Sequence, residues 1–315
     1  MFGTILIGII IIFIILGAMF WWVGERGKLF MPSTLKFIRE GGLLRFLNFS
    51  TLHGYIYMRW QKSYVRIMLT QLEPRSTQFT RRWWADQYHS KVLTEQQASA
   101  LLTIHENILH QDLEQVIPYP VARNIVLSAS PKITAYQCAC RLSRKTSCTP
   151  TQVCMFIGDP FASFMLEHHP EESKALTQAE ALELLKSEHE RGHIHTAWFK
   201  NAMHDRFYAI CNCCKCCCGG IEGMVKHGTP TMSSSGYIAR LDEALCTTCG
   251  ACLDFCPFGA LSLESHSVIS WDKCMGCGVC VDQCPSGALS LLRDERKGLP
   301  LDVRVLLSGE SPALM

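Results

Sequence analysis

The chain has 315 residues, with 30 basic and 28 acidic side chains, and this near-neutral balance excludes a polybasic nucleic-acid-binding protein. Hydrophobic residues make up 48% and charged residues 18%, which excludes wholesale disorder and allows a sizeable core. All 18 cysteines lie between Cys138 and Cys284, mostly two to four residues apart. This bunching is typical of metal or cluster ligation and not of a secreted disulfide scaffold.

An uncharged stretch near the N-terminus predicts a membrane anchor. Ile5 to Val23 is long enough, at about 1.5 Å per residue, to cross nearly all of a hydrocarbon core of about 30 Å. Phe20, Trp21 and Trp22 stand at its end, where an interfacial aromatic belt is expected. No basic residue precedes the stretch and no A-x-A motif follows it, so a cleaved signal peptide is disfavoured, as is a buried core helix. We predict a single-pass transmembrane anchor over residues 1–24.

Residues 25–92 are predicted to form a basic, membrane-proximal helical segment. Residues 25–91 hold 12 basic and four acidic side chains, a net charge of +8. Positive charge just after an anchor favours retention of that side in the cytoplasm, so we expect the cluster domains there. Interleaved apolar residues suit helices on anionic membrane lipid or on a partner subunit, although an ordinary solvated basic face is an alternative.

Residues 93–218 are predicted to form a central α/β cysteine-rich domain. Capping boxes at Thr94 with Gln97 and at Thr177 with Glu180 predict two helix starts, and Gly192 predicts a helix stop. Pro120 predicts a further helix through 121–127, and 133–136 predicts a short strand. We interpret His168 and His169, before Pro170, as part of a solvated turn.

The C-terminal part divides into a linker, a small module and a tail. Residues 219–236 are rich in Gly, Ser and Thr and are predicted to be a flexible linker. Residues 237–292 form the module, and no prediction is made for the tail, 293–315. The overall fold class expected is α+β: an N-terminal transmembrane helix, the central α/β domain and a C-terminal dicluster domain.

The module carries the strongest motif, C-x2-C-x2-C-x3-C-P, twice at an offset of 28 residues. Three cysteines of each run can face three corners of an iron–sulfur cube, while the cysteine before the proline supplies the fourth corner of the other cube. Glycines in the loops, Gly250, Gly276 and Gly278, let backbone N–H groups approach the sulfurs. Zinc sites usually pair two C-x2–4-C knuckles and do not fit this pattern. The predicted ligand sets are Cys246, Cys249, Cys252 and Cys284 for cluster 1, and Cys274, Cys277, Cys280 and Cys256 for cluster 2.

Residues 237–292 resemble the bacterial two-[4Fe–4S] ferredoxin domain in both cysteine runs. The resemblance implies a ferredoxin-like βαβ repeat around two close clusters that carries electrons. It does not imply a particular donor or acceptor.

Ten further cysteines lie outside the module, and six of them fall within eight residues. Such density excludes a simple disulfide pattern and predicts one or two further iron–sulfur clusters, with zinc or an unusual cluster as alternatives. The candidates are Cys138, Cys140, Cys148, Cys154, Cys211, Cys213, Cys214, Cys216, Cys217 and Cys218. The C-x-C-R stretch at 138–141 and the C-N-C-C-x-C-C-C run at 211–218 also resemble a group of bacterial ferredoxin-fusion proteins, a resemblance that implies no particular activity.

Two histidines complete the candidate site. His193 and His195, two residues apart, would face the same side of an extended segment and could ligate metal or relay protons, but a hydrogen-bonded pair at a helix exit is the favoured interpretation. No catalytic group can be nominated from spacing, and no phosphate-binding glycine motif supports nucleotide binding.

The sequence therefore predicts a membrane-anchored electron-transfer protein that passes electrons through two [4Fe–4S] clusters, and through one or more further clusters, to a redox partner protein or membrane complex. The alternative is an iron–sulfur reductase with a substrate site in the central domain. A metal-binding regulatory protein is a weaker third hypothesis. An electron-transfer subunit is favoured over a stand-alone oxidoreductase.

Overall fold

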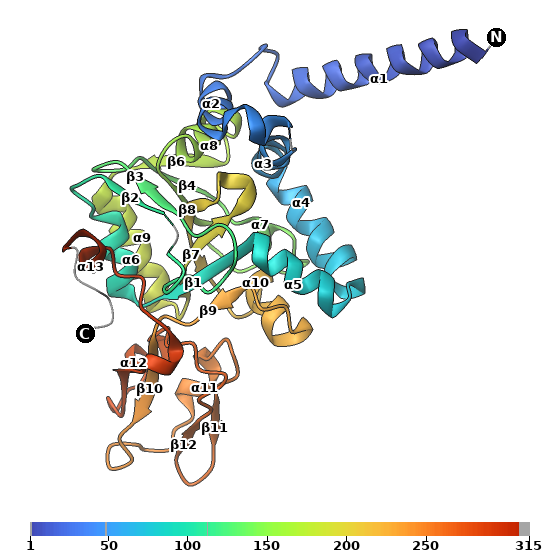
Figure 1. Cartoon of the computed structure of the whole chain (residues 1–315). Helices are drawn as coiled ribbons and strands as arrows, with labels where there is room; N and C mark the ends of the chain where they lie inside the picture. Colours follow the sequence, from blue (N-terminus) through green and yellow to red (C-terminus); the bar gives the residue numbers. More distant parts are fainter. Residues whose placement is uncertain (1, 48, 112, 309–315) are drawn as a thin grey trace.

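The structure is a computed structural model that describes residues 2–47, 49–111 and 113–308. A mixed helix and strand body carries a projecting helix, α1, and a small C-terminal module (Figure 1). The projecting helix and the module lie at opposite ends of the body (Figure 1). The C-terminal module therefore lies away from the N-terminal helix.

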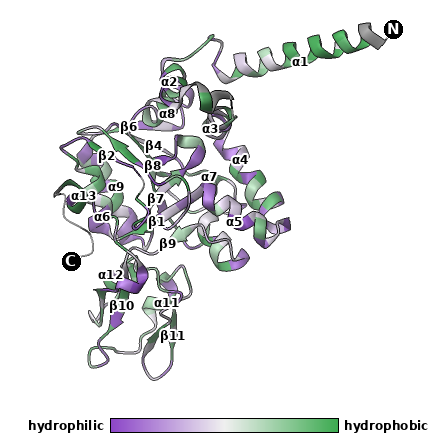
Figure 2. Cartoon of the chain, viewed as in Figure 1, coloured by the Kyte–Doolittle hydropathy of each residue, from purple (hydrophilic) through white to green (hydrophobic). Residues whose placement is uncertain are grey.

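Helix α1 (Phe2–Gly24) contains a candidate membrane span, Ile5–Gly24, with a mean hydropathy of 2.8. The helix is apolar along most of its length (Figure 2) and is not covered by other parts of the molecule. Its C-terminal end is held by aromatic stacking, with ring centroids 4.3 Å apart for Phe20 and Trp60 and 5.0 Å apart for Trp21 and Tyr55. Two of the three aromatic residues expected at a membrane interface thus attach the helix to the body.

The basic segment that follows is helical, as predicted. Its buried side chains, among them Phe37, Tyr57 and Met58, belong to a core shared with the sheet of the central domain. The segment therefore covers a protein face in addition to exposing its basic residues. Its elements are α2 (Pro32–Leu47), α3 (Ser50–Arg59), α4 (Gln61–Ile67), the π-helix η1 (Met68–Leu72), the 3-10 turn η2 (Glu73–Arg75) and α5 (Gln78–Gln87).

A seven-stranded sheet with the order β6-β4-β5-β8-β7-β1-β9 forms the centre of the body. All neighbouring strands are antiparallel except β1 and β9, which are parallel. Its strands are β1 (Tyr88–Leu93), β4 (Ile133–Gln137), β5 (Gln152–Ile157), β6 (Ser173–Leu176), β7 (Ile194–Lys200), β8 (Arg206–Cys213) and β9 (Met232–Ser233). The helices of this domain are α6 (Glu95–Leu102), α7 (Ala139–Leu142), α8 (Phe161–His168) and α9 (Gln178–Glu190), with the 3-10 turn η3 (Asn201–Met203).

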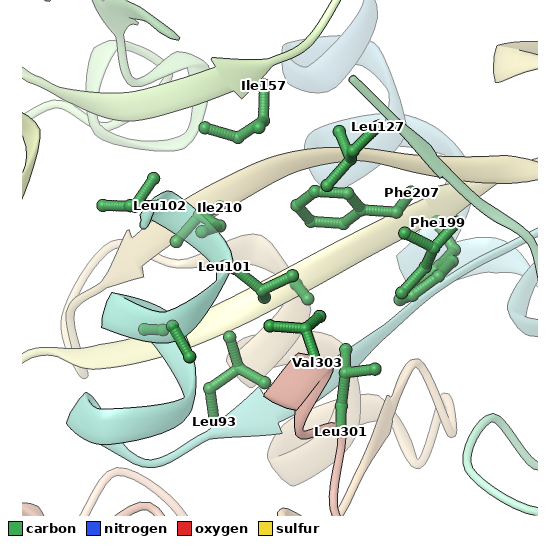
Figure 3. Close-up of a cluster of buried hydrophobic side chains, with 14 of the residues drawn as sticks. Leu93, Leu101, Leu102, Leu127, Ile157, Phe199, Phe207, Ile210, Leu301 and Val303 are labelled. Carbon is green, nitrogen blue, oxygen red and sulfur yellow. The ribbon is translucent and has the colours of Figure 1, made fainter. Parts of the chain in front are cut away.

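Each face of the sheet has its own hydrophobic core, because successive strand residues point to opposite faces. On β7, Trp198 joins the core beneath α3 and α8, whereas Phe199 joins the core beneath α6 and α9. The second core is closed by Leu301 and Val303 from the C-terminal tail (Figure 3). These two residues lead into and begin the last helix, α13 (Val303–Ser308), so the tail completes the central domain.

Several local predictions can be checked directly. Both capping boxes are present, at the starts of α6 and α9, and the strand predicted over 133–136 is β4. Gly192 has a φ of +79° just after α9, as expected of a helix stop. The helix predicted over 121–127 is wrong, because Ala122 has a left-handed φ of 57° and β3 (Ile125–Leu127) pairs with β2 (Ile108–His110). His168 and His169 are buried, not solvated.

The segment 219–236 differs from the flexible linker expected of its composition. It forms α10 (Gly219–Glu222), the π-helix η4 (Gly223–His227) and β9, which extends the sheet along β1. Ser235 is fully buried and its hydroxyl donates to the carbonyl of Gly276 in the C-terminal module, 2.6 Å away. The small polar residues therefore allow the central domain and the C-terminal module to pack closely together.

The C-terminal module has two short antiparallel pairs, β10 with β13 and β11 with β12. Its elements are β10 (Tyr237–Leu241), α11 (Ala251–Phe255), β11 (Leu261–Leu263), β12 (Ser267–Ile269), α12 (Val279–Asp282), β13 (Leu289–Arg293) and the 3-10 turn η5 (Glu295–Lys297). Each short helix begins after a loop that carries cysteines, and the strand pairs hold these loops in place.

Candidate metal centres

The eight cysteines of the module surround two separate small cavities. Each cavity takes three cysteines from one sequence run and the cysteine before the proline of the other run, which is the crossed arrangement expected of two close cubes. One cavity is lined by Cys256, Cys274, Cys277 and Cys280. The other is lined by Cys246, Cys249, Cys252 and Cys284. We call these sets the inner quartet and the outer quartet.

Backbone conformation at the glycines lets the loops wrap around these cavities. Gly250 and Gly278 adopt a left-handed conformation immediately before α11 and α12, with φ of 75° and 86°. A side chain at Gly276 would collide with the carbonyl oxygen of Tyr237. Backbone N–H groups reach two sulfurs, since Ala260 N lies 3.2 Å from Cys256 Sγ and Ala239 N lies 3.5 Å from Cys274 Sγ. Such N–H···S bonds stabilise charge on a bound cluster.

The two quartets differ in exposure. Cys249 of the outer quartet is exposed, and backbone N–H groups of Ser267 and Thr248 lower the pKa of the Cys246 thiol. In the inner quartet, burial raises the pKa of the Cys277 thiol to about 12. The outer quartet is therefore the one nearer to solvent and to any soluble partner, whereas the inner quartet is enclosed.

The inner quartet lies against the central domain. Cys256 and Cys277 pack on the hydrophobic core that contains Cys213 and Cys218. Lys215, in the middle of the central cysteine run, donates to the backbone carbonyls of Leu253 and Asp254 at 3.2 and 3.1 Å. These carbonyls lie between two module cysteines, so the two cysteine regions are in direct contact.

Six of the ten central cysteines form one continuous series of thiol contacts, which we call the thiol ring. The contacts run from Cys211 to Cys154, on to Cys138 and Cys140, and through Cys218 to Cys213. Cys154, Cys211 and Cys213 come from β5 and β8, Cys138 and Cys140 flank the start of α7, and Cys218 precedes α10. Four separate elements thus converge on this ring.

The thiols of the ring oppose each other's ionisation. The neighbouring Cys140 thiol, together with burial, raises the pKa of Cys138 to about 12. Contacts with Cys138 and Cys211, together with burial, raise the pKa of Cys154 well above its ordinary value. Thiolates crowded in this way need a positively charged centre to bind, and an iron–sulfur core can bind several of them, one sulfur to each iron.

The other four central cysteines, Cys148, Cys214, Cys216 and Cys217, form a compact group that we call the thiol tetrad. Their sulfurs all lie within 4.8 Å of one another, with Cys217 Sγ 3.3 Å from Cys216 Sγ and 3.5 Å from Cys148 Sγ. Burial alone would raise the pKa of Cys217. Hydrogen bonds from the Cys148 backbone and the neighbouring thiols outweigh burial, and that pKa is lowered.

The tetrad is more compact than the module quartets. Among the described residues, no three cysteines of either quartet come within the same 4.8 Å limit. A tetrahedral zinc site with Zn–S bonds of about 2.3 Å has sulfurs roughly 3.8 Å apart. A cube needs more widely spaced sulfurs because each one binds a different iron. The tetrad spacing therefore fits one ion, and the quartet spacing fits a cluster.

Basic residues near the thiols are already paired. Arg141 and Glu188 are both fully buried and form an ion pair at 2.8 Å. Arg144 pairs with Glu222 and donates to the carbonyl of Cys217 at 3.0 Å. Through these pairs the two arginines connect the cysteine loops to α9 and α10.

The two histidines do not belong to either thiol group. His193 Nδ1 lies 2.7 Å from a carboxylate oxygen of Glu188, and His195 Nδ1 lies 2.7 Å from the side-chain oxygen of Asn212. Asn212 alternates on β8 with Cys211 and Cys213, so the His195 pair lies on the opposite face of the sheet from these thiols. The geometry matches a hydrogen-bonded role for each histidine.

The six cysteines of the thiol ring line a cavity of about 610 Å³, which no sequence pattern predicted. It is bounded by α3, α4 and α5 on one side and by the sheet face that carries Cys154 and Cys211 on the other. Lys200 and Tyr208, from β7 and β8, also line it. Lys200 ends β7, and its position in the sequence does not reveal which helices would cover that strand.

The comparisons with known proteins bear on the module alone. Residues 238–294 match the family model described as 4Fe-4S dicluster domain. No curated protein and no solved structure matches the chain. The C-terminal module is therefore a ferredoxin-type dicluster domain, which implies at least one [4Fe–4S] cluster and iron–sulfur electron transfer.

Proposed function

We propose that this chain is a membrane-anchored iron–sulfur protein that passes electrons through two [4Fe–4S] clusters and at least one further cluster to a redox partner. The observation that carries the proposal is the pair of crossed cysteine quartets in a segment that matches a dicluster family. Bound [4Fe–4S] clusters would supply one-electron chemistry at low potential. The chain's own residues hold the clusters, tune them and set their order.

The order of the sites follows from exposure and contact. The outer quartet, with exposed Cys249, is placed to exchange electrons with a partner protein. The inner quartet packs on the core that also holds Cys213 and Cys218 of the thiol ring. Electrons would therefore pass between the partner and the central domain by way of the outer and then the inner quartet, in either direction.

The ten central cysteines would serve two kinds of site. The thiol ring offers six sulfurs from four elements and suits a further iron–sulfur cluster. The thiol tetrad suits one tetrahedral ion such as zinc, which would hold the loop before β5 against the cysteine run after β8. The sequence predicted one or two further iron–sulfur clusters. This proposal keeps one of them, at the thiol ring, and places a single structural ion at the thiol tetrad in place of the second.

The membrane and partner assignments complete the proposal. The candidate span at the N-terminus would anchor the chain, and the basic segment would face membrane lipid or a membrane complex on the cytoplasmic side. Cytoplasmic reducing conditions would also keep the thiols available for iron.

Metal analysis of anaerobically purified full-length protein tests the core of the proposal. We expect about eight irons from the module and about four from the thiol ring, with equivalent sulfide and one zinc. EPR of the reduced protein should show spin-coupled clusters. Zinc with negligible iron and sulfide would contradict the proposal.

Membrane fractionation tests the anchor. The full-length chain should stay in the membrane fraction through high-salt and carbonate washing, whereas a variant lacking residues 1–24 should retain only salt-sensitive binding through its basic helices. Protease added outside intact spheroplasts should spare the dicluster domain. A fully soluble full-length chain would remove the anchor, and digestion of the dicluster domain would reverse the topology.

One observation favours the alternative function, a reductase with its substrate site in the central domain. The cavity that the thiol ring lines has a volume of about 610 Å³, within the range of small-molecule binding sites. A cluster at the ring would use the part of the cavity next to the thiols, and an electron-transfer subunit without a substrate does not need the part that extends to Lys200.

A further inference from the structure

The cavity lined by the thiol ring, which we call the lysine cavity, extends beyond the thiols themselves. It extends from Cys154 and Cys211 across the sheet face to Lys200 and reaches the helices α3, α4 and α5. Trp84 and Val65 of these helices give the far wall an apolar and aromatic surface, and Glu73 of η2 adds a carboxyl group to it. A cluster at the thiols would take up part of the 610 Å³, and the space between the aromatic residues and Lys200 suits a small organic molecule.

Lys200 is the only ammonium group that lines this cavity among the described residues. Its side chain is 4% exposed, and its Nζ lies 4.4 Å from the ring centroids of both Tyr57 and Tyr88. No carboxylate of the described part of the chain forms an ion pair with it. Aromatic faces stabilise the ammonium only in part, so a buried amine in this position favours a ligand with an oxygen acceptor.

The lysine is poised to donate a proton as well as a hydrogen bond. Burial lowers the pKa of Lys200 to about 7, so both its charged and neutral forms are accessible near neutral pH. Tyrosine hydroxyls continue the polar lining, since Tyr57 Oη lies 2.9 Å from Tyr208 Oη. Both tyrosines line the cavity together with Lys200 and Cys211, so this hydroxyl pair belongs to the same wall as the lysine and the thiol ring.

We propose that the lysine cavity binds a lipophilic quinone, with one quinone oxygen accepting a hydrogen bond from Lys200. The proposal rests on the function proposed above, because the ring must hold a cluster for the quinone to exchange electrons. Quinones combine the three properties that the cavity selects: an apolar ring system, carbonyl oxygens and acceptance of single electrons. A membrane anchor also places the protein where such compounds concentrate.

The reaction balances as a two-electron, two-proton reduction. The quinone takes two electrons, one at a time, from reduced clusters, each of which returns to its oxidised form. One carbonyl oxygen takes a proton from the Lys200 ammonium, which is reprotonated from solvent, and the other oxygen takes a proton from solvent. The product is the hydroquinone, and the reverse reaction would deliver electrons to the clusters.

The test uses iron-loaded full-length protein in detergent and menadione as the probe. Quenching of tryptophan fluorescence reports binding to the oxidised protein, since Trp84 and Trp198 line the cavity. Stopped-flow absorbance reports oxidation of the dithionite-reduced clusters by menadione. We expect saturable binding and an oxidation rate that saturates with menadione concentration.

Two variants and one control make the test specific. Lys200→Met should weaken binding about tenfold or more, the effect of losing a hydrogen bond from a charged donor, and should lower the saturating rate. Val65→Trp should fill part of the cavity and abolish binding. Lys132→Met, which changes an exposed lysine outside the cavity, should behave as the unchanged protein. Iron content should be the same in all four proteins.

The outcomes separate this inference from the proposed function. The quinone site would be overturned, and electron transfer left standing, by iron-loaded protein that shows no saturable menadione binding. Binding in Lys200→Met and Val65→Trp that equals binding in the unchanged protein would have the same consequence. Saturable binding without oxidation of the clusters would overturn the redox role of the site. Protein that binds menadione but holds no iron would instead overturn the proposed function.

Discussion

The dicluster module and the central domain bring their cysteines together in different ways. In the module, each quartet takes three sulfurs from one short loop, and the fourth comes from a second loop with the same cysteine spacing 28 residues away. In the central domain, the thiol ring collects sulfurs from β5, β8 and the starts of α7 and α10. A local loop carries its ligand geometry wherever it is placed, whereas a dispersed site exists only when the whole sheet is assembled.

This difference predicts different sensitivities to mutation. Disruption of the sheet should empty the thiol ring but leave the module loaded. Loss of one module cysteine should affect a single cluster. The three predictions below test this comparison, from the largest expected effect to the smallest.

The first prediction separates the thiol ring from the thiol tetrad. Cys154→Ser with Cys211→Ser should remove about four irons and keep zinc, because both residues belong to the ring. Cys148→Ser with Cys216→Ser should remove the single zinc and keep the iron, because both belong to the tetrad. Metal analysis of each double variant gives the result. Equal loss of iron from the two variants would show that the central thiols form one site.

The second prediction tests the crossed ligation of the module. Cys256→Ser should disturb the cluster held by Cys274, Cys277 and Cys280, although it belongs to the first sequence run. Cys284→Ser is the matched variant and should disturb the outer cluster. EPR of the reduced proteins should show loss of spin coupling in both variants. Loss of the outer cluster in Cys256→Ser, with the inner cluster intact, would refute the crossed arrangement.

The third prediction concerns the tail that closes the central core. Leu301 is fully buried beside Val303, so Leu301→Ala should lower the free energy of unfolding of the central domain by about 2–5 kcal/mol. Leu263→Ala, at a half-exposed position of the module, should change stability by only about 0.5 kcal/mol. Circular dichroism during thermal unfolding of metal-loaded protein measures both. Equal midpoints would show that the tail does not support the core.

The same contrast explains which predictions succeeded. The two capping boxes and the stop at Gly192 depend on hydrogen bonds and a φ angle within a few residues, and they are present. The helix expected after Pro120 failed because β2 pairs with that segment, a contact that its own residues do not reveal. The prediction of a flexible linker over 219–236 failed because this segment pairs with β1 and forms a hydrogen bond to the module.

The basic segment and two of the histidines show that local sequence patterns do not reveal packing partners. The sequence predicted a basic helical segment after the anchor, and residues 32–87 are largely helical. It did not predict that these helices would cover the sheet and enclose Lys200, because helical periodicity names the buried face of a helix but not its partner. The histidines at 168 and 169 were likewise placed in a turn by local composition, although they pack beneath the N-terminal helices.

The sequence by itself determined the apolar N-terminal span, the two cysteine runs and the dicluster character of the C-terminal module, because each of these is encoded in consecutive residues. The tertiary structure alone decided how the ten central cysteines divide into a ring and a tetrad. It also decided that the ring faces an apolar cavity with a buried lysine. Strands distant in the chain must pair before those side chains meet, and that pairing depends on burial of two hydrophobic cores, which no local spacing specifies.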